Sequence, residues 1–219
     1  MTGLTTIQQV AVSILPILFG ITVHEVAHGW AASKLGDNTA KMLGRLTLNP
    51  LKHIDPFGTI IVPILLYWMS HGAFIFGWAR PVPVNFRNLK KLRRDSALVA
   101  AAGPLSNLLM AIIWALIGRL GVVLFNAGFF WAQAIFLMGM IGIVLNVWLM
   151  VLNLIPIPPL DGSHIVSSLL PPRAAMLYER IAPFGMFILL FLLISRALVY
   201  IIYPIVGFIS YYIRMILGA

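Results

Sequence analysis

Residues 7–33, IQQVAVSILPILFGITVHEVAHGWAAS, form a long apolar segment whose single charged side chain is Glu25. This segment predicts a membrane-spanning helix. A helix of this length exceeds the roughly 20 residues that cross the ~30 Å hydrocarbon core of a bilayer. His24 and His28 lie in the same segment as Glu25. Because ionisable groups are costly in lipid, all three require a reason to be there.

The rest of the chain is equally apolar. Of 219 residues, 61% are hydrophobic and 10% are charged, and the mean hydropathy is +0.98. Soluble domains have roughly 45–50% apolar and about 25% charged residues. The composition therefore excludes a water-soluble globule and predicts a multi-pass protein that contacts the lipid bilayer. No cysteine is present, so any metal ion must be held by His, Asp or Glu.

The positive charge is concentrated in one part of the chain. The net charge is +9, and ten of the 15 Lys and Arg residues lie between positions 34 and 94. In a membrane protein such clusters mark loops on the cytoplasmic side, so we expect no nucleic-acid partner and predict cytoplasmic loops at residues 34–55 and 87–95. The chain is therefore expected to be a multi-pass membrane protein with these loops, and the end of the first helix that carries the histidines, at the cytoplasmic face. The N-terminus lacks the pattern of a cleavable signal peptide, so the first helix is expected to remain.

Further apolar segments complete the predicted architecture. Residues 96–120 and 131–152 are predicted spanning helices, and residues 181–217 are either one broken span or two short helices. The expected fold class is an all-α polytopic membrane protein with about four to six membrane segments. Without repeats or linkers, residues 1–219 are expected to form a single membrane-embedded domain.

A re-entrant element is predicted between the two basic loops. Residues 57–69 are apolar but too short to cross a bilayer comfortably as a helix. Residues 74–85, FIFGWARPVPVN, alternate prolines with valines, which favours an extended edge strand. We therefore predict a small re-entrant β-hairpin, whose exposed strand over residues 76–85 could pair with an unwound substrate peptide.

The sequence His24-Glu25-Val26-Ala27-His28 is an HExxH motif. Residues four apart share one helical face, so both imidazoles can bind a single Zn²⁺. Glu25 would then act as general base on the water bound to the metal. The alternative is a set of polar side chains that pair between helices.

Asp161 is the expected third metal ligand. Catalytic zinc sites have three protein ligands and one open position. Asp161 alone among the acidic residues follows an apolar helix that ends in prolines, on the side of the membrane predicted for His24 and His28. The alternative role for Asp161 is to cap the helix that starts near Ser163.

These motifs together resemble the site-2 protease family of intramembrane zinc metalloproteases. HEVAH in a membrane helix is paired with NLIPIPPLDG (153–162), and LNPLKHIDPFGT (48–59), FGWARPVPVN (76–85) and AGPLSN (102–107) resemble the compact prokaryotic branch. The resemblance covers about residues 20–165. It implies a zinc endopeptidase that cleaves transmembrane segments of other membrane proteins, as regulated proteolysis or signal-peptide remnant clearance. The compact branch that the chain resembles has no PDZ or cystathionine-synthase-type domain, so none is expected here.

The resemblance also implies roles for individual residues. His24, His28 and Asp161 would hold one zinc ion, and Glu25 would activate water. Asn153 matches an asparagine proposed to contact substrate or stabilise the oxyanion, a role that suits a side-chain amide donor.

Other polar residues receive weaker assignments. Asn107 could hydrogen-bond near the site, although packing is the main role expected for residues 103–107. His53 and His71 could be alternative ligands, but His53 is expected to order its loop or the re-entrant segment, and His71 to face solvent or the interface. His164, one turn beyond Asp161, is a weak candidate for a supporting contact.

A different class of function shares these features. A transporter, or a non-proteolytic binder, could use the same His/Asp cluster for a metal ion or a proton. Transporters usually show paired halves or internal repeats, which are not visible here. The oligomeric state is not predicted.

Overall fold

The computed structural model describes residues 5–69 and 77–218, and the described chain is helical. The α-helices of this part are α1 Thr6–Leu35, α2 Thr39–Met42, α3 Val62–Met69, α4 Leu92–Asn126, α5 Ala132–Asn153, α6 Asp161–Leu169, α7 Pro172–Glu179, α8 Ala182–Ile194 and α9 Ala197–Arg214. Short 3₁₀ turns and one π-helical turn, Pro56–Ile61, lie between them.

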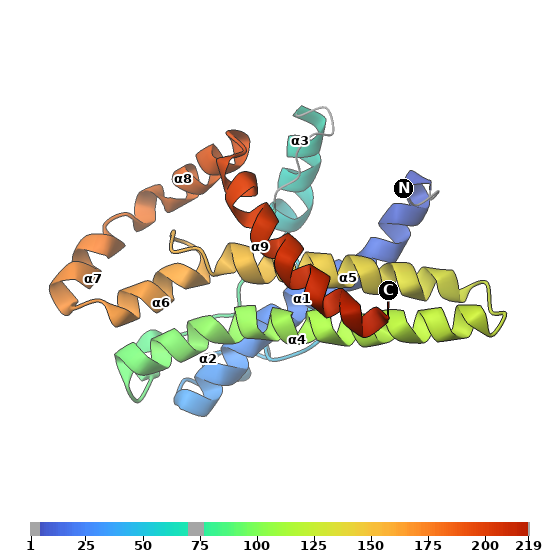
Figure 1. Cartoon of the computed structure of the whole chain (residues 1–219). Coiled ribbons are helices and arrows are strands. Elements are labelled where there is room, and N and C mark those ends of the chain that lie inside the picture. The colour runs from blue at the N-terminus through green and yellow to red at the C-terminus, as the bar shows by residue number, and fades with distance from the viewer. Residues whose placement is uncertain (1–4, 70–76, 219) are drawn as a thin grey trace.

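Three long helices form the centre of the molecule. α4 and α5 run side by side, and α1 crosses them and packs against both (Figure 1). The α4–α5 contact is very close, because a Cβ atom on Gly139 would lie 2.4 Å from the Cα of Gly118. Small residues of this kind let two membrane helices approach backbone to backbone. The central helices therefore hold a fixed relative position, which the site described below depends on.

Four helices of the described residues are long and apolar enough to cross a membrane: α1, α4, α5 and α9, the last extended to Leu217. α7 and α8 together would make a fifth candidate, bent by 59°. Large apolar side chains on these helices remain exposed, for example Phe187 at 72% and Phe191 at 70%. Such surfaces suit lipid rather than water. The prediction of a multi-pass membrane protein is confirmed.

The C-terminal tail forms two helices. α8 ends at Ile194 and α9 begins at Ala197, and between them Arg196 has a left-handed backbone with φ of 60°. Pro204 lies inside α9 without ending it. α9 crosses over α4 and α5 (Figure 1) and buries Leu198, Ile202 and Val206 in the main core.

The predicted β-hairpin is wrong. Residues 56–69 are helical, and residues 77–85 are extended but form no strand within the described chain. Pro81 and Pro83 carry no N–H and cannot take part in a regular β-ladder. The N–H groups of Trp78 and Arg80 donate instead to the carbonyls of Gly58 and His53. Residues 74–76 of the predicted strand lie outside the described residues.

Candidate metal centre

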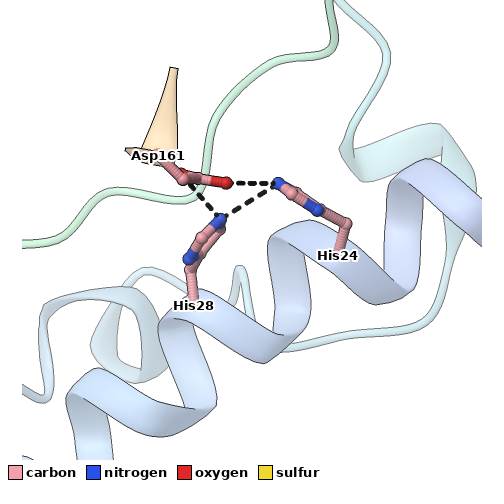
Figure 2. Close-up of side chains that lie close together, drawn as sticks. All are labelled: His24, His28 and Asp161. Carbon is pink, nitrogen blue, oxygen red and sulfur yellow. Dashed lines mark hydrogen bonds and ion pairs between the residues drawn. The ribbon is translucent and has the colours of Figure 1, made fainter. Parts of the chain in front are cut away.

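Three side chains that can bind a metal converge from two distant parts of the chain. His24 and His28 lie on successive turns of α1, and Asp161 is the first residue of α6 (Figure 2). The two Nε2 atoms are 3.0 Å apart. His24 Nε2 lies 3.2 Å from Asp161 Oδ2, and His28 Nε2 lies 3.3 Å from Asp161 Oδ1. All three ligand atoms lie within 4.8 Å of one another, so the group could hold a metal ion.

The second nitrogen of each imidazole is bonded to the protein. His28 Nδ1 donates to the carbonyl of Val99 at 2.7 Å, and His24 Nδ1 donates to Asn107 Oδ1 at 2.6 Å. In neutral histidines this leaves a lone pair on each Nε2. Two such lone pairs and a carboxylate repel one another unless a cation lies between them. The donor set therefore fits a metal ion, and nitrogen plus carboxylate oxygen is a ligand combination that zinc accepts.

A buried chain of amides fixes the tautomer of His24. Asn107 Nδ2 donates to the carbonyl of Gly20 and to Asn146 Oδ1, both at 3.1 Å. Asn146 Nδ2 in turn donates to the carbonyl of Gly142 at 2.9 Å. Because both carbonyls can only accept, each amide has one orientation, and Asn107 presents its oxygen to His24. Both asparagines have no exposed surface, so no water competes for these bonds.

Asp161 makes no helix cap. Leu160 is the N-cap residue of α6, and no side-chain hydrogen bond caps this helix. Asp161 Oδ2 is buried and has no hydrogen-bond donor in the described chain. A buried carboxylate oxygen without a donor is costly, and a metal ion would satisfy it. This observation favours the ligand role over the cap.

Asp55 and Asp95 accept hydrogen bonds from backbone N–H groups at the starts of helices. Asp55 accepts from the N–H groups of Phe57 and Gly58, and Asp95 accepts from the N–H of Lys91. These are helix-start contacts of the usual kind. Neither carboxylate joins the group formed by the two histidines and Asp161.

Asp37 anchors the extended segment to the end of α1. Its fully buried carboxylate accepts from the N–H of Asn85 at 2.7 Å and from Asn88 Nδ2 at 2.9 Å. Thr39 contributes two more donors. Burial acts to raise the pKa of Asp37, but these hydrogen bonds outweigh it and hold the pKa below the ordinary value of 3.8. Asp37 therefore remains ionised and keeps residues 85–88 in place.

Gly103 allows α4 to approach the histidines. A Cβ atom at this position would lie 2.4 Å from His28 Nε2 and 2.6 Å from His24 Cε1. No side chain can therefore be added here without moving an imidazole. The small residues of AGPLSN serve both helix packing and the close approach of α4 to His24 and His28.

Glu25 contacts the extended segment. Its Oε2 accepts from the backbone N–H of Val82 at 2.8 Å. Pro81 and Pro83 flank Val82 and have no N–H, so Val82 supplies the single donor of this tripeptide. The Val82 side chain is 6% exposed and packs against α1 near Gly29. The segment predicted as a substrate-binding strand thus holds the carboxylate of Glu25.

Three other residues singled out in the sequence contact other parts of the chain. Asn153 ends α5, and its Nδ2 donates to the carbonyl of Leu149. His53 is buried and its Nε2 bonds the carbonyl of Thr47, in keeping with its predicted loop role. His164 is exposed and stacks on Phe86, with ring centroids 5.4 Å apart. His71 lies outside the described residues.

Comparison with known proteins identifies the family. The family model "Peptidase family M50" matches residues 12–132 and 122–195. The chain belongs to peptidase family M50. This membership confirms the resemblance to site-2 proteases and the prediction of a metalloprotease of that type.

Two relatives carry the name "Putative zinc metalloprotease". YwhC of Bacillus subtilis is 40% identical over 196 residues, which cover 87% of this chain and 84% of YwhC. Rip2 of Mycolicibacterium smegmatis is 32% identical over 198 residues, which cover 88% of this chain and 71% of Rip2. No solved structure matches this one.

Two contacts in this M50 chain went unnoticed in the sequence. Asn146 is an uncharged polar residue in a long apolar helix, and its cost in lipid was a signal that it has a partner. The Val82 contact could have been suspected from a lone N–H between two prolines. Neither partner could be named from the sequence, because each comes from a distant part of the chain.

Proposed function

We propose that this chain is an intramembrane zinc endopeptidase that hydrolyses peptide bonds in or near transmembrane segments of other membrane proteins. His24, His28 and Asp161 hold one zinc ion per chain, and Glu25 is the general base. The observation that carries the proposal is the convergence of three ligand atoms within 4.8 Å, on and beside a helix apolar enough to span a membrane. The zinc metalloprotease names of the M50 relatives agree with this ligand set.

The chain's own residues supply most of the chemistry. Asn107 and the Val99 carbonyl orient the two imidazoles, which keeps their Nε2 atoms available as ligands. Glu25 accepts the proton of the attacking water and passes it to the leaving amine, with the N–H of Val82 fixing its carboxylate. The metal, when bound, supplies Lewis-acid polarisation of the scissile carbonyl.

Asn153 is proposed to contact the substrate near the scissile bond. Its Nδ2 now donates to the carbonyl of Leu149 in its own helix. It takes the substrate role by exchanging this bond for one to the peptide. Asn153→Ala should therefore lower the cleavage rate and leave zinc binding unchanged, and loss of zinc in this variant would contradict the assignment.

The membrane proposed is a prokaryotic cytoplasmic membrane, with the site nearer the cytoplasmic face. The support is the position of the basic loops, since residues 34–55 directly follow the end of α1 that carries the histidines. Positive loops are retained on the cytoplasmic side. Labelling of single cysteines introduced at Lys41 and Asn126 would test it, because the two positions are expected on opposite sides.

The central experiment separates metal binding from catalysis. Zinc per chain and cleavage of a membrane-embedded helical reporter are measured in proteoliposomes for wild type, Glu25→Gln, His28→Ala and Asp161→Ala. We expect zinc to be lost in His28→Ala and Asp161→Ala, and Glu25→Gln to keep zinc while cleavage stops. His164→Ala is the matched control, because this histidine is exposed and its ring stacks on Phe86. Full cleavage by Glu25→Gln would refute the base assignment, and zinc retained in Asp161→Ala would refute the ligand.

A further inference from the structure

A basic pocket lies on the loop side of the extended segment. Its volume is about 490 Å³, and it is lined by Leu43, Arg45, Leu51, Lys52, Ile54, Arg80, Pro81 and Pro83. Three of the lining side chains are cationic and none is acidic. Within the described residues, none of these three cations forms an ion pair with a carboxylate. The pocket lining therefore concentrates positive charge, and the nearest opposing charge that acts on Arg45, the carboxylate of Glu25, is not part of that lining.

Arg45 carries the strongest sign of a missing partner. Its Nη2 donates to the carbonyls of Arg80 and Pro81, but its Nε is buried and has no acceptor among the described residues. Burial, followed by the neighbouring charge of Arg80, lowers the pKa of Arg45. Two guanidinium groups with spare N–H donors suit a phosphate, which accepts several hydrogen bonds at once.

The surface around the pocket is apolar. Leu51 is 74% exposed, and Leu43 and the neighbouring Met42 are 63% and 76% exposed. Exposed leucines beside unpaired arginines and lysines are typical of a protein surface at the level of lipid headgroups. The cytoplasmic leaflet predicted for these loops is the one that carries anionic lipids.

We infer that this pocket binds the phosphate of an anionic phospholipid, held by Arg45, Lys52 and Arg80 while the acyl chains lie against Leu43 and Leu51. Pro81 and Pro83 line the pocket on either side of Val82, whose N–H holds Glu25. A bound headgroup therefore fixes the segment that positions Glu25, which links lipid binding to the site. This link rests on the proposed function, whereas the binding itself does not.

The test measures lipid binding without any cleavage assay. Detergent-solubilised full-length chain is titrated with phosphatidylglycerol or phosphatidylcholine, and the lipid-bound fraction is read by native mass spectrometry. We expect the wild type to prefer phosphatidylglycerol, and Lys52→Gln/Arg80→Gln to bind it about 10- to 30-fold more weakly. Arg45 is left unchanged in this double variant, because it donates hydrogen bonds to the carbonyls of Arg80 and Pro81 in the extended segment.

A matched control keeps the same net charge. Arg173→Gln/Arg180→Gln removes two exposed cations in and just after α7, away from the pocket lining, and should bind phosphatidylglycerol like wild type. Equal weakening in both double variants would overturn the proposal, because it would show general attraction to a basic protein. Unchanged binding in Lys52→Gln/Arg80→Gln would overturn it as well.

Inorganic phosphate distinguishes the source of the ligand. Competition by excess phosphate against phosphatidylglycerol in the wild type would support a site that recognises the phosphate group. Binding of inorganic phosphate without any preference for phosphatidylglycerol would overturn the lipid assignment. If the pocket binds lipid but no variant cleaves a reporter, the proposed function fails and the lipid site stands.

Discussion

Asn107→Leu should weaken zinc binding without touching a metal ligand. The substitution removes the acceptor of His24 Nδ1–H, and Asn107 is fully buried, so water cannot replace it. An unsatisfied buried donor costs about 1–3 kcal/mol. Since each 1.4 kcal/mol is a factor of ten in an equilibrium constant, we expect the Kd for zinc to rise about 10- to 100-fold, the range typical of lost support for a metal-binding histidine.

The assay is zinc competition with a chromophoric chelator on purified, detergent-solubilised protein. Asn146→Leu should give a smaller effect, because Asn107 keeps its bonds to Gly20 and His24 when Asn146 is lost. Asn126→Leu is the control, since this exposed asparagine ends the same helix. A Kd for Asn107→Leu within about threefold of wild type would refute the reasoning, because the cost would then lie below that of one unsatisfied donor.

Three further substitutions test the surroundings of the site. Gly103→Ala should lose most of its zinc by metal analysis, since its Cβ would lie 2.4 Å from His28 Nε2, whereas Gly207→Ala, with open space around it, should keep zinc. Val82→Pro removes the N–H that holds Glu25 and should lower kcat about tenfold at unchanged zinc content, while Val82→Ala keeps the N–H and should remain active. Asp37→Asn should lower the free energy of unfolding by about 1–3 kcal/mol at neutral pH, measured by thermal unfolding in detergent. The folded-state pKa of Asp37 is below 3.8, so the stabilisation is complete above that value and disappears as pH falls through the folded-state pKa; a difference between wild type and Asp37→Asn that persists unchanged under acid would contradict this.

The sequence was most informative where spacing alone fixes geometry. His24 and His28 lie four residues apart, so any α-helix through them puts both imidazoles on one face. Two of the three long central helices were well placed: residues 7–33 and 131–152 were predicted, and the helices form over Thr6–Leu35 and Ala132–Asn153. The helix predicted over residues 96–120 is longer at both ends and spans Leu92–Asn126. The break in the tail was left open, since an arginine in a left-handed conformation at residue 196 has no sequence marker as clear as glycine.

Contacts between side chains of different helices could not be predicted from the sequence. Asn146 meets Asn107 because α5 and α4 adopt one rotation about their axes, and that rotation results from packing at Gly118 and Gly139. The valine–proline alternation over residues 81–84 correctly predicted an extended backbone, but the predicted strand does not form in the described chain. Backbone N–H groups of residues 78–85 donate instead to the carbonyls of Gly58 and His53 and to the carboxylates of Glu25 and Asp37, and no strand pattern reveals such acceptors.

The order in which the metal centre is synthesised limits when the protein can become active. His24 precedes its partner Asn107 by 83 residues, and Asp161 follows later still. A nascent chain that has inserted only its first helix presents two histidines without their orienting amide or their carboxylate. With the proposed ligands, zinc can be held stably only after α4, α5 and the start of α6 have left the ribosome, so on this proposal a chain that is still being made has no complete site.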